Sequence, residues 1–266
     1  MSFQEKNSVR ALIVDMDGVL WRQSQPIGDL GQIFAKINAK GLKITLATNN
    51  ATLTVQQYLQ KLASFGVTLS ADQIVNSPQA AAMYMVNHFP PGSSIFVIGK
   101  DGLRQEMLNH GYHIANGTEN KSVVAVVVGM DWDLRFEQLC QATLLLRSGA
   151  EFIATNGDRT FPTPQGLVPG VGAILALLET ASEKKPIIVG KPDPLMYQIA
   201  LERMNVQPED CLVVGDRLET DILGGQKLGC QTALVLSGVT TPEQARAWYP
   251  PPDWICQTFE EVIDQL

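Results

Sequence analysis

The sequence has few of the residues that build disulfide scaffolds, zinc sites or membrane spans. Its 266 residues include 4 cysteines without a C-x-x-C pair and 3 histidines without zinc-site spacing. We therefore expect buried free thiols in a reducing compartment. The longest apolar runs, such as residues 123–128 and 173–178, are far shorter than the roughly 18 residues that a membrane helix needs. We expect neither a disulfide scaffold nor a membrane-spanning protein.

Positive charge is also scarce. The chain has 20 Lys and Arg against 27 Asp and Glu, a net charge of -7, and no segment gathers basic residues together. Because binding to nucleic acid or to anionic lipid needs clustered positive charge, we expect no nucleic-acid partner and no membrane partner. Residues 1–10 are polar and lack the apolar segment of a secretory signal. We therefore expect a cytoplasmic protein.

The apolar residues form short β-branched runs that alternate with amphipathic helical patterns. The first run, residues 11–15, precedes a helical pattern at residues 29–40. Further runs lie at residues 42–48, 94–99, 123–129, 152–155, 187–190, 211–215 and 232–236. Most runs are continuously apolar, as in strands that helices cover on both faces. The sequence therefore predicts an α/β protein with a largely parallel sheet.

Polar residues follow four of the predicted strands. In chain order they are Asp15, Asp17, Thr48, Asn49, Lys191, Asp216 and Asp221. Because ligands of an open parallel sheet bind beyond the carboxyl ends of the strands, we expect these side chains to converge. Four carboxylates at one point would repel one another unless a cation lies among them. Oxygen ligands completed by water and phosphate are typical of Mg²⁺.

The other candidates suit an anion. Lys191 offers a positive charge, while Thr48 and Asn49 offer hydroxyl, amide and backbone donors for a phosphoryl group. A carboxylate facing a metal-polarised phosphorus can attack it, and a second aspartate can handle the proton. Taken alone, an aspartate at a strand end is most often a helix cap or a turn former, Lys191 also fits a solvated loop lysine, and residues 48–50 also fit an ordinary turn. Their joint order favours phosphoryl transfer through an aspartyl-phosphate.

Four motifs in this order resemble those of the haloacid-dehalogenase superfamily, and within it the NagD-like phosphatase branch. They are Asp15-Met16-Asp17-Gly18, Thr48-Asn49-Asn50, Gly190-Lys191-Pro192 and Gly215-Asp216-Arg217-Leu218-Glu219-Thr220-Asp221. The similarity covers nearly the whole chain. It implies a Rossmann-like parallel sheet core with an inserted α/β cap domain. It also implies a Mg²⁺-dependent phosphatase acting on small phosphomonoesters of the nucleotide, sugar, glycolate or glycerol phosphate type.

The resemblance implies a chemical role for each candidate. Asp15 would be the nucleophile, and Asp17 would act as general acid and then as general base. Thr48 and Asn49 would hold the phosphoryl oxygens, and Lys191 would neutralise the nucleophile and the phosphate. The dehalogenases of the superfamily lack the second aspartate, so a phosphatase is favoured over a dehalogenase.

The same resemblance implies a metal site. Mg²⁺ would be held by the Asp15 carboxylate, by the backbone carbonyl of Asp17 and by Asp216. Asp221 would act from behind these ligands, holding either a metal-bound water or Lys191. Trp21, which closely follows the first motif, is interpreted either as a packing residue or as a substrate contact.

The spacing of the motifs predicts two domains. Asp17 and Thr48 are 31 positions apart, which is enough only for a loop, a helix and a strand. Thr48 and Lys191 are 143 positions apart, whereas one or two further βα units need roughly 30 to 60 residues. We therefore expect residues 1–76 and 187–266 to form the core and residues 77–186 to form the cap, which in the family covers the site and selects the substrate.

Two other functions remain open from the sequence. One is a catalytically weak relative that binds phosphometabolites, and the other is a phosphorylatable signalling module. Receiver modules are far shorter and lack an acid two residues after the phospho-acceptor, which favours the enzyme. The sequence leaves the physiological substrate and the oligomeric state open, a homo-oligomer included.

Overall fold

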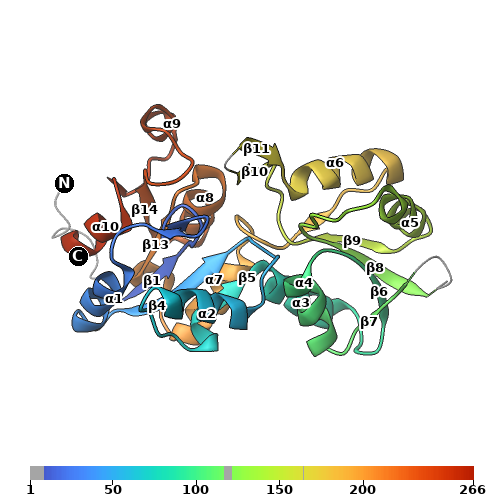
Figure 1. The fold of residues 1–266 in the computed structure, drawn as a ribbon, viewed down its shortest axis with the longest axis horizontal. Helices are drawn as coiled ribbons and strands as arrows, with labels where there is room; N and C mark the ends of the chain where they lie inside the picture. Colours follow the sequence, from blue (N-terminus) through green and yellow to red (C-terminus); the bar gives the residue numbers. More distant parts are fainter. Residues whose placement is uncertain (1–8, 117–121, 164) are drawn as a thin grey trace. The chain divides into compact units, whose positions relative to one another are not determined.

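The structure is a computed structural model that describes residues 9–116, 122–163 and 165–266. Residues 1–8, on which most of the expectation of no secretory signal rests, lie outside these ranges. The chain divides into two compact units, whose elements are labelled in Figure 1. Unit 1 is Met1–Thr48, Tyr58–Val75 and Lys191–Leu266, and unit 2 is Asn49–Gln57 and Asn76–Gly190. Among the described residues, none of the helices has the length and apolar character to cross a membrane.

Unit 1 is built on a six-stranded sheet. Its strands, in order across the sheet, are β15 (Trp254–Cys256), β14 (Gln231–Val235), β13 (Cys211–Gly215), β1 (Ala11–Val14), β4 (Lys43–Thr48) and β5 (Ile74–Asn76). The neighbouring strands from β15 to β4 all run parallel. All residues of β1 and β13 are buried, which explains their continuously apolar sequences. The predicted α/β class with a parallel sheet is confirmed.

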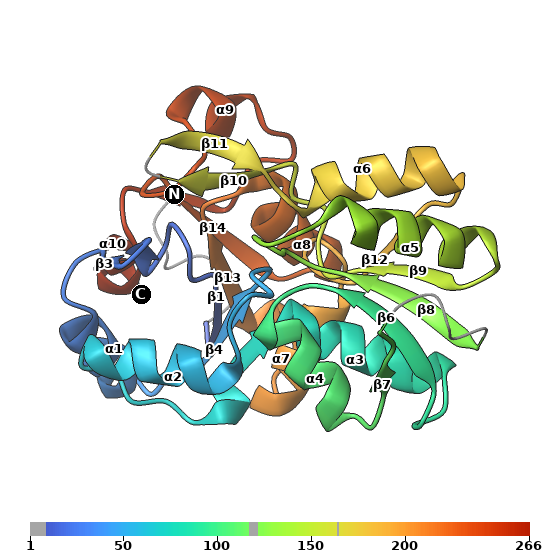
Figure 2. The ribbon, with the colours of Figure 1, turned by 45° about the vertical axis from the view of Figure 1, so that its right-hand side comes forward.

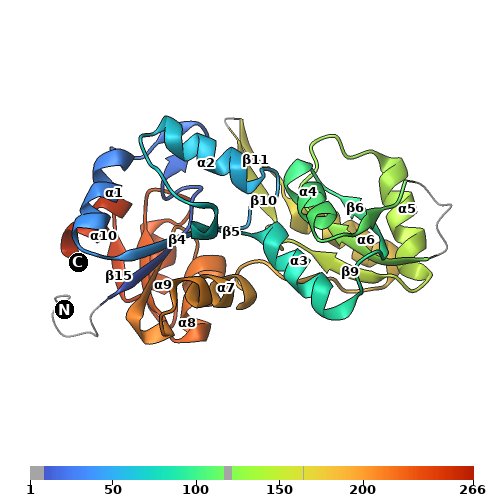
Figure 3. The same ribbon diagram turned by 90° about the horizontal axis from the view of Figure 1, so that it is seen from below.

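Helices cover both faces of this sheet. They are α1 (Leu30–Ala39), α2 (Val55–Ser64), α7 (Leu195–Met204), α8 (Leu223–Leu228), α9 (Pro242–Ala247) and α10 (Phe259–Gln265). Figure 3 shows α1 and α10 on one side and α7 and α8 on the other. Helix α1 begins after Asp29, whose side chain accepts a hydrogen bond from the Gln32 backbone, and it confirms the helix expected at residues 29–40.

Shorter elements complete unit 1. A hairpin of β2 (Trp21–Arg22) and β3 (Gln25–Pro26) directly follows the first motif. A π-helical turn, Leu218–Ile222, follows β13 and leads into α8. Single turns of 3₁₀ helix lie at Ala71–Gln73 and Pro208–Asp210. The hairpin and the π-helical turn both lie where the sequence places candidate site residues.

Unit 2 has its own five-stranded sheet. Across the sheet the strands are β12 (Ile187–Ile188), β9 (Glu151–Ala154), β8 (Val123–Val128), β6 (Ser94–Ile98) and β7 (His113–Ile114). Every neighbouring pair runs parallel. An antiparallel hairpin, β10 (Thr160–Thr163) and β11 (Gly166–Pro169), precedes the last helix of the unit.

The sheet of unit 2 is also covered on both faces. Its helices are α3 (Ser77–His88), α4 (Asp101–Asn109), α5 (Phe136–Arg147) and α6 (Val171–Ser182). Figure 2 shows α5 and α6 on one side of the sheet and α3 and α4 on the other. Buried side chains of β6, β8 and β9 pack against α5 and α6 to form a hydrophobic core. Unit 2 is therefore a layered α/β body with its own core.

One predicted strand joins a different sheet from the one expected. Residues 187–190 were expected to end at the same sheet edge as the other three motifs, but β12 pairs with β9 of unit 2. It forms only two residues of half-buried edge strand. An apolar run does not encode which neighbour it will pair with, so this choice depends on the packing around it. Lys191 therefore reaches the first sheet without following one of its strands.

Candidate active site

The first motif lies where β1 ends at the centre of the unit 1 sheet. The Asp15 backbone N–H donates to the Val214 carbonyl at 2.9 Å, which extends the parallel ladder by one residue. Asp15 is buried and Asp17 is half-buried. Gly18 then turns the chain with φ +89°, and a Cβ there would lie 2.4 Å from Asp216 Oδ2. The motif therefore needs glycine both for its backbone angle and for the space it leaves to a carboxylate.

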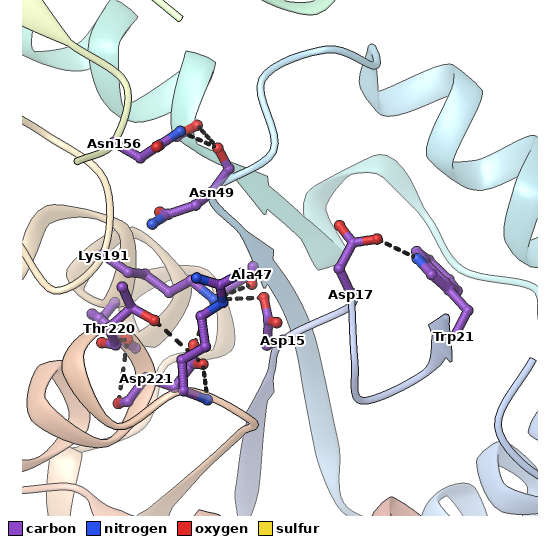
Figure 4. Close-up of polar contacts among 12 residues, drawn as sticks. Asp15, Asp17, Trp21, Ala47, Asn49, Asn156, Lys191, Thr220 and Asp221 are labelled. Atoms are coloured by element: carbon purple, nitrogen blue, oxygen red, sulfur yellow. Dashed lines mark hydrogen bonds and ion pairs between the residues drawn. The ribbon is translucent and has the colours of Figure 1, made fainter. Parts of the chain in front are cut away.

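Lys191 joins two of the candidate carboxylates. Its Nζ donates to Asp15 Oδ1 at 2.6 Å, to Asp221 Oδ1 at 2.6 Å and to the Ala47 carbonyl at 2.9 Å (Figure 4). Only 3% of the Lys191 side chain is exposed. Short charge-assisted bonds in a buried setting hold the ammonium in one position. Of the two expected roles for Asp221, the structure shows the contact with Lys191.

Asp216 and Asp221 follow β13 and are both buried. The π-helical turn lets Asp221 Oδ2 accept from the Arg217 backbone N–H at 3.1 Å. Asp216 Oδ2 accepts from the Val239 N–H at 2.7 Å. Asp216 Oδ1 is buried and has no hydrogen-bond partner among the described residues. A buried carboxylate oxygen left in this way is available to a bound cation.

Carboxylate oxygens of Asp15, Asp216 and Asp221 lie within 4.8 Å of one another. When all three are ionised, the single ammonium of Lys191 leaves two negative charges uncompensated. An all-oxygen cluster with this charge deficit fits a hard divalent cation such as Mg²⁺. The orphaned Asp216 oxygen supports the same assignment.

The pKa values in the cluster follow from this crowding. Burial raises the pKa of Asp15 well above its usual value, Lys191 opposes the rise, and Asp221 and Asp216 add to it. Burial and then Asp221 raise the pKa of Asp216 from 3.8 to about 7. Burial lowers the pKa of Lys191, but Asp15 and Asp221 outweigh it and the pKa lies well above 10.5. The cluster thus favours a charged lysine and, without a cation, resists holding every carboxylate ionised.

Thr48 ends β4 and is buried. Its side chain forms a hydrogen bond with the phenol of Tyr58 on α2, and burial followed by the charge of Asp17 raises the pKa of Tyr58 well above 10.0. Tyr58 was not predicted from the sequence as a site residue. The amphipathic pattern of α2 shows that this side faces inward, but a pattern cannot show that the hydroxyl reaches Thr48.

Asn49 follows Thr48 in the chain but groups with unit 2. Its backbone carbonyl accepts from Ser77 Oγ at 2.8 Å and from Asn156 Nδ2 at 2.9 Å. Six of the seven candidates, all except Asn49, therefore belong to unit 1. Among these six, Asp15, Asp216, Asp221 and Lys191 form one buried cluster.

Asp17 points in a different direction from Asp15. Figure 4 shows the Asp15 carboxylate directed at Lys191 and the Asp17 carboxylate directed at Trp21. Trp21 Nε1 donates to Asp17 Oδ1 at 2.9 Å, and the indole is fully buried. Of the two interpretations of Trp21, packing is the one this burial favours, since a buried ring offers no surface to a substrate.

Two further glycines, for which the sequence predicted no role at the site, make room for the carboxylates. A Cβ on Gly238 would lie 1.8 Å from Asp216 Oδ2, and a Cβ on Gly215 would lie 2.1 Å from Asp221 Cβ. Any side chain at these positions would displace the carboxylate beside it. Gly238 follows β14, far from the four motifs in sequence, so no local signal identifies it.

Comparisons with known proteins match two segments of the chain to protein families. Residues 12–113 match a family described as haloacid dehalogenase-like hydrolase, and residues 188–262 match one described as HAD-hydrolase-like. The chain is 36% identical over 280 positions to phosphoglycolate phosphatase 2 of Arabidopsis thaliana, covering 97% of this chain and 93% of that protein. The matched segments contain all the candidate residues.

Two solved structures share the fold over nearly the whole chain. NagD from E. coli K-12 is 31% identical with a TM-score of 0.86, over 96% of this chain and 98% of NagD. The glycerol phosphate phosphatase of Mycobacterium tuberculosis, solved in complex with magnesium, is 30% identical with a TM-score of 0.88, over 97% of this chain and 78% of that one. This chain therefore belongs to the haloacid dehalogenase-like hydrolases, in their NagD-like phosphatase branch.

Proposed function

We propose that this protein is a Mg²⁺-dependent phosphatase that hydrolyses small phosphomonoesters through an aspartyl-phosphate on Asp15. The main observation is the buried cluster in which Lys191 bridges Asp15 and Asp221, while one oxygen of Asp216 has no hydrogen-bond partner among the residues that the structure describes. Relatives named as phosphatases of phosphoglycolate and glycerol phosphate support a small phosphomonoester as the substrate.

The proposed reaction has two steps. An Asp15 carboxylate oxygen attacks phosphorus, the ester P–O bond breaks, and Asp17 gives a proton to the leaving oxygen. Asp17 then accepts a proton from water as that water attacks the phosphorus. The bond to Asp15 breaks, phosphate leaves and the carboxylate is restored.

The other residues of the site position the phosphate. Asp15, Asp216 and the Asp17 carbonyl would hold Mg²⁺, which supplies positive charge that offsets the phosphate and the carboxylates. Lys191 adds a positive charge beside the nucleophile, and this charge is worth most when water is excluded. Thr48, held by the Tyr58 hydroxyl, and Asn49 donate to phosphoryl oxygens.

We also propose a domain organisation, a compartment and a class of partner for this protein. On the basis of motif spacing we assign the core to residues 1–76 and 187–266 and a substrate-selecting cap to residues 77–186; β12, at the start of the second core segment, pairs with β9 of unit 2. The four cysteines are free thiols, which supports a reducing compartment such as the cytoplasm; three are buried as expected, whereas Cys140 is exposed. The proposed partner is a small phosphomonoester rather than a nucleic acid or a membrane, and the oligomeric state is left open.

A panel of phosphorylated metabolites, assayed for phosphate release with Mg²⁺, tests the function. We expect release from phosphoglycolate, glycerol phosphate or sugar phosphates, and none from the Asp15→Asn variant purified in parallel. Saturable binding of phosphometabolites without release, for p-nitrophenyl phosphate as well, would favour the non-catalytic relative. A stable phosphoprotein formed without turnover would favour the signalling module.

The Mg²⁺-free protein should lose thermal stability as pH rises. Because the pKa of Asp216 is raised from 3.8 to about 7, its contribution to stability is complete below about pH 3.8 and is lost as pH rises through about 7. Bound Mg²⁺ offsets the repulsion between the ionised carboxylates of the cluster. The increase in Tm that Mg²⁺ causes should therefore be several degrees larger at about pH 8 than at about pH 5. Calorimetry with Mg²⁺ and with EDTA measures the difference. A change in Tm on adding Mg²⁺ that is the same at both pH values would contradict the prediction.

Gly238→Ala should weaken Mg²⁺ binding. The new Cβ would lie 1.8 Å from Asp216 Oδ2, so the carboxylate must move and its bond from Val239 must break. We expect the Mg²⁺ concentration that gives half-maximal activity to rise at least tenfold and the Tm to fall. Gly229→Ala is the control: Gly229 has a positive φ, so alanine is strained there, but nothing lies close to the new Cβ. The control should lose stability while keeping normal Mg²⁺ dependence, and equal Mg²⁺ dependence in both variants would contradict the prediction.

A further inference from the structure

We propose that Trp21 is a positioning residue for Asp17: its indole N–H holds the Asp17 carboxylate in the orientation used for proton transfer. The inference rests on the proposed function, in which Asp17 is the general acid and base. Trp21 Nε1 lies 2.9 Å from Asp17 Oδ1, and Figure 4 shows the ring edge facing the carboxylate. The indole has only this one donor, and burial makes an unmade hydrogen bond costly.

The backbone brings the two side chains together. After Asp17 the chain turns at Gly18, whose N–H donates to the Trp21 carbonyl at 2.8 Å. The N–H groups of Leu20 and Trp21 return to the Met16 carbonyl at 2.9 and 3.4 Å. Trp21 then enters the β2–β3 hairpin. This tight loop fixes the Trp21 backbone relative to Asp17.

Helix α2 and the residue after it hold the indole ring. Lys61 Nζ lies 3.9 Å from the centroid of the Trp21 ring and also donates to the Gln23 carbonyl at 2.8 Å. The Phe65 ring lies 6.1 Å from the Trp21 ring, centroid to centroid. Lys61 lies in the last turn of α2, and Phe65 directly follows the helix. The indole ring is thus held by Lys61, on the helix that also carries Tyr58, and by Phe65.

Packing alone does not account for this arrangement. Phenylalanine would fill much of the same space, but it has no N–H to direct at a carboxylate. An aspartate side chain has several staggered orientations, and proton transfer requires one of them. Lys191 donates to Asp15 and to Asp221, whereas the indole N–H donates to Asp17. The indole therefore supplies Asp17 with an orienting donor that comes from its own loop.

Trp21→Phe tests the inference because it removes the N–H and keeps an aromatic ring. An alkyl phosphate such as glycerol phosphate needs its leaving oxygen protonated, whereas nitrophenolate leaves without a proton. General acid–base catalysis contributes about 10²–10⁴-fold, so we expect kcat for glycerol phosphate to fall roughly 10- to 100-fold with KM within about threefold. With p-nitrophenyl phosphate the first step should stay fast while hydrolysis of the aspartyl-phosphate slows, giving a burst of nitrophenolate.

Lys61→Met is the second variant, in case Trp21→Phe does not fold. It keeps an unbranched apolar side chain beside the ring but removes the cation, so we expect the same pattern with a smaller loss, roughly threefold. Asp17→Asn supplies the reference: adding Trp21→Phe to it should not change the ratio of the two substrates further. Equal losses for both substrates without a burst, in each foldable variant, would show that Trp21 only packs and would overturn the inference.

The same experiment separates this inference from the proposed function. If Asp15→Asn still turns over both substrates, the aspartyl-phosphate mechanism is wrong, whatever Trp21 does. If Asp15→Asn is inactive and Trp21→Phe is as active as the wild type on both substrates, the mechanism stands and only the role of Trp21 is wrong.

Discussion

Asp15→Asn should lower phosphate release by on the order of 10⁴-fold or more, because an amide cannot replace the attacking carboxylate. The variant should fold normally. Its side-chain oxygen can still accept from Lys191, which also keeps the bond to Asp221 at 2.6 Å. Removing one carboxylate from the buried cluster relieves repulsion, so we expect a Tm at or above that of the wild type without Mg²⁺.

Mass spectrometry can identify the covalent intermediate directly. Asp17→Asn is the useful variant, since it keeps the nucleophile but removes the base that activates water. After acid quenching with p-nitrophenyl phosphate, we expect phosphate on the peptide that contains Asp15. A phosphate that is never found on the protein, together with inversion at a chiral phosphorus, would show direct attack by water and would contradict the two-step mechanism.

Asp216→Asn should abolish the response to Mg²⁺ while stabilising the Mg²⁺-free protein. The amide oxygen can accept from the Val239 N–H in place of Asp216 Oδ2, so the loop should keep its shape. The amide nitrogen then takes the place of Asp216 Oδ1, the oxygen with no hydrogen-bond partner among the described residues, and it cannot bind a cation. We expect Mg²⁺ affinity to fall at least about 100-fold and turnover to fall about as far.

Isothermal titration with Mg²⁺ and thermal denaturation with and without Mg²⁺ measure both effects. Asp264→Asn is the matched control, because it removes the same charge from an exposed carboxylate that pairs with Lys36. It should leave Mg²⁺ affinity unchanged. Undiminished Mg²⁺ binding by Asp216→Asn would remove this residue from the metal site.

The parallel sheet was predictable because strands buried on both faces need continuously apolar runs, a local property of the sequence. β1 and β13 are wholly buried and match the runs at residues 11–15 and 211–215. Short edge strands carry less of this signal. β5 and β15, of three residues each, were therefore not predicted.

The cluster of Asp15, Lys191, Asp216 and Asp221 follows from the order of motifs, and the structure brings these four together. Their chemical roles, and those of Asp17, Thr48 and Asn49, remain a proposal. The sequence could not assign Asp221 its contact, since an acidic side chain near a metal site can serve water or lysine equally well. The distance of 2.6 Å to Lys191 supplies that contact.

The sequence by itself determined the α/β class, the strands that carry the motifs and the residue types at the site. These depend on local hydrophobic patterning and on chemistry that each side chain carries with it. Only the tertiary structure decided that β12 joins the second sheet, that Tyr58 supports Thr48 and that Trp21 orients Asp17. It also decided that Gly238 makes room for Asp216. Each of these contacts depends on packing and side-chain direction, which a one-dimensional pattern does not encode.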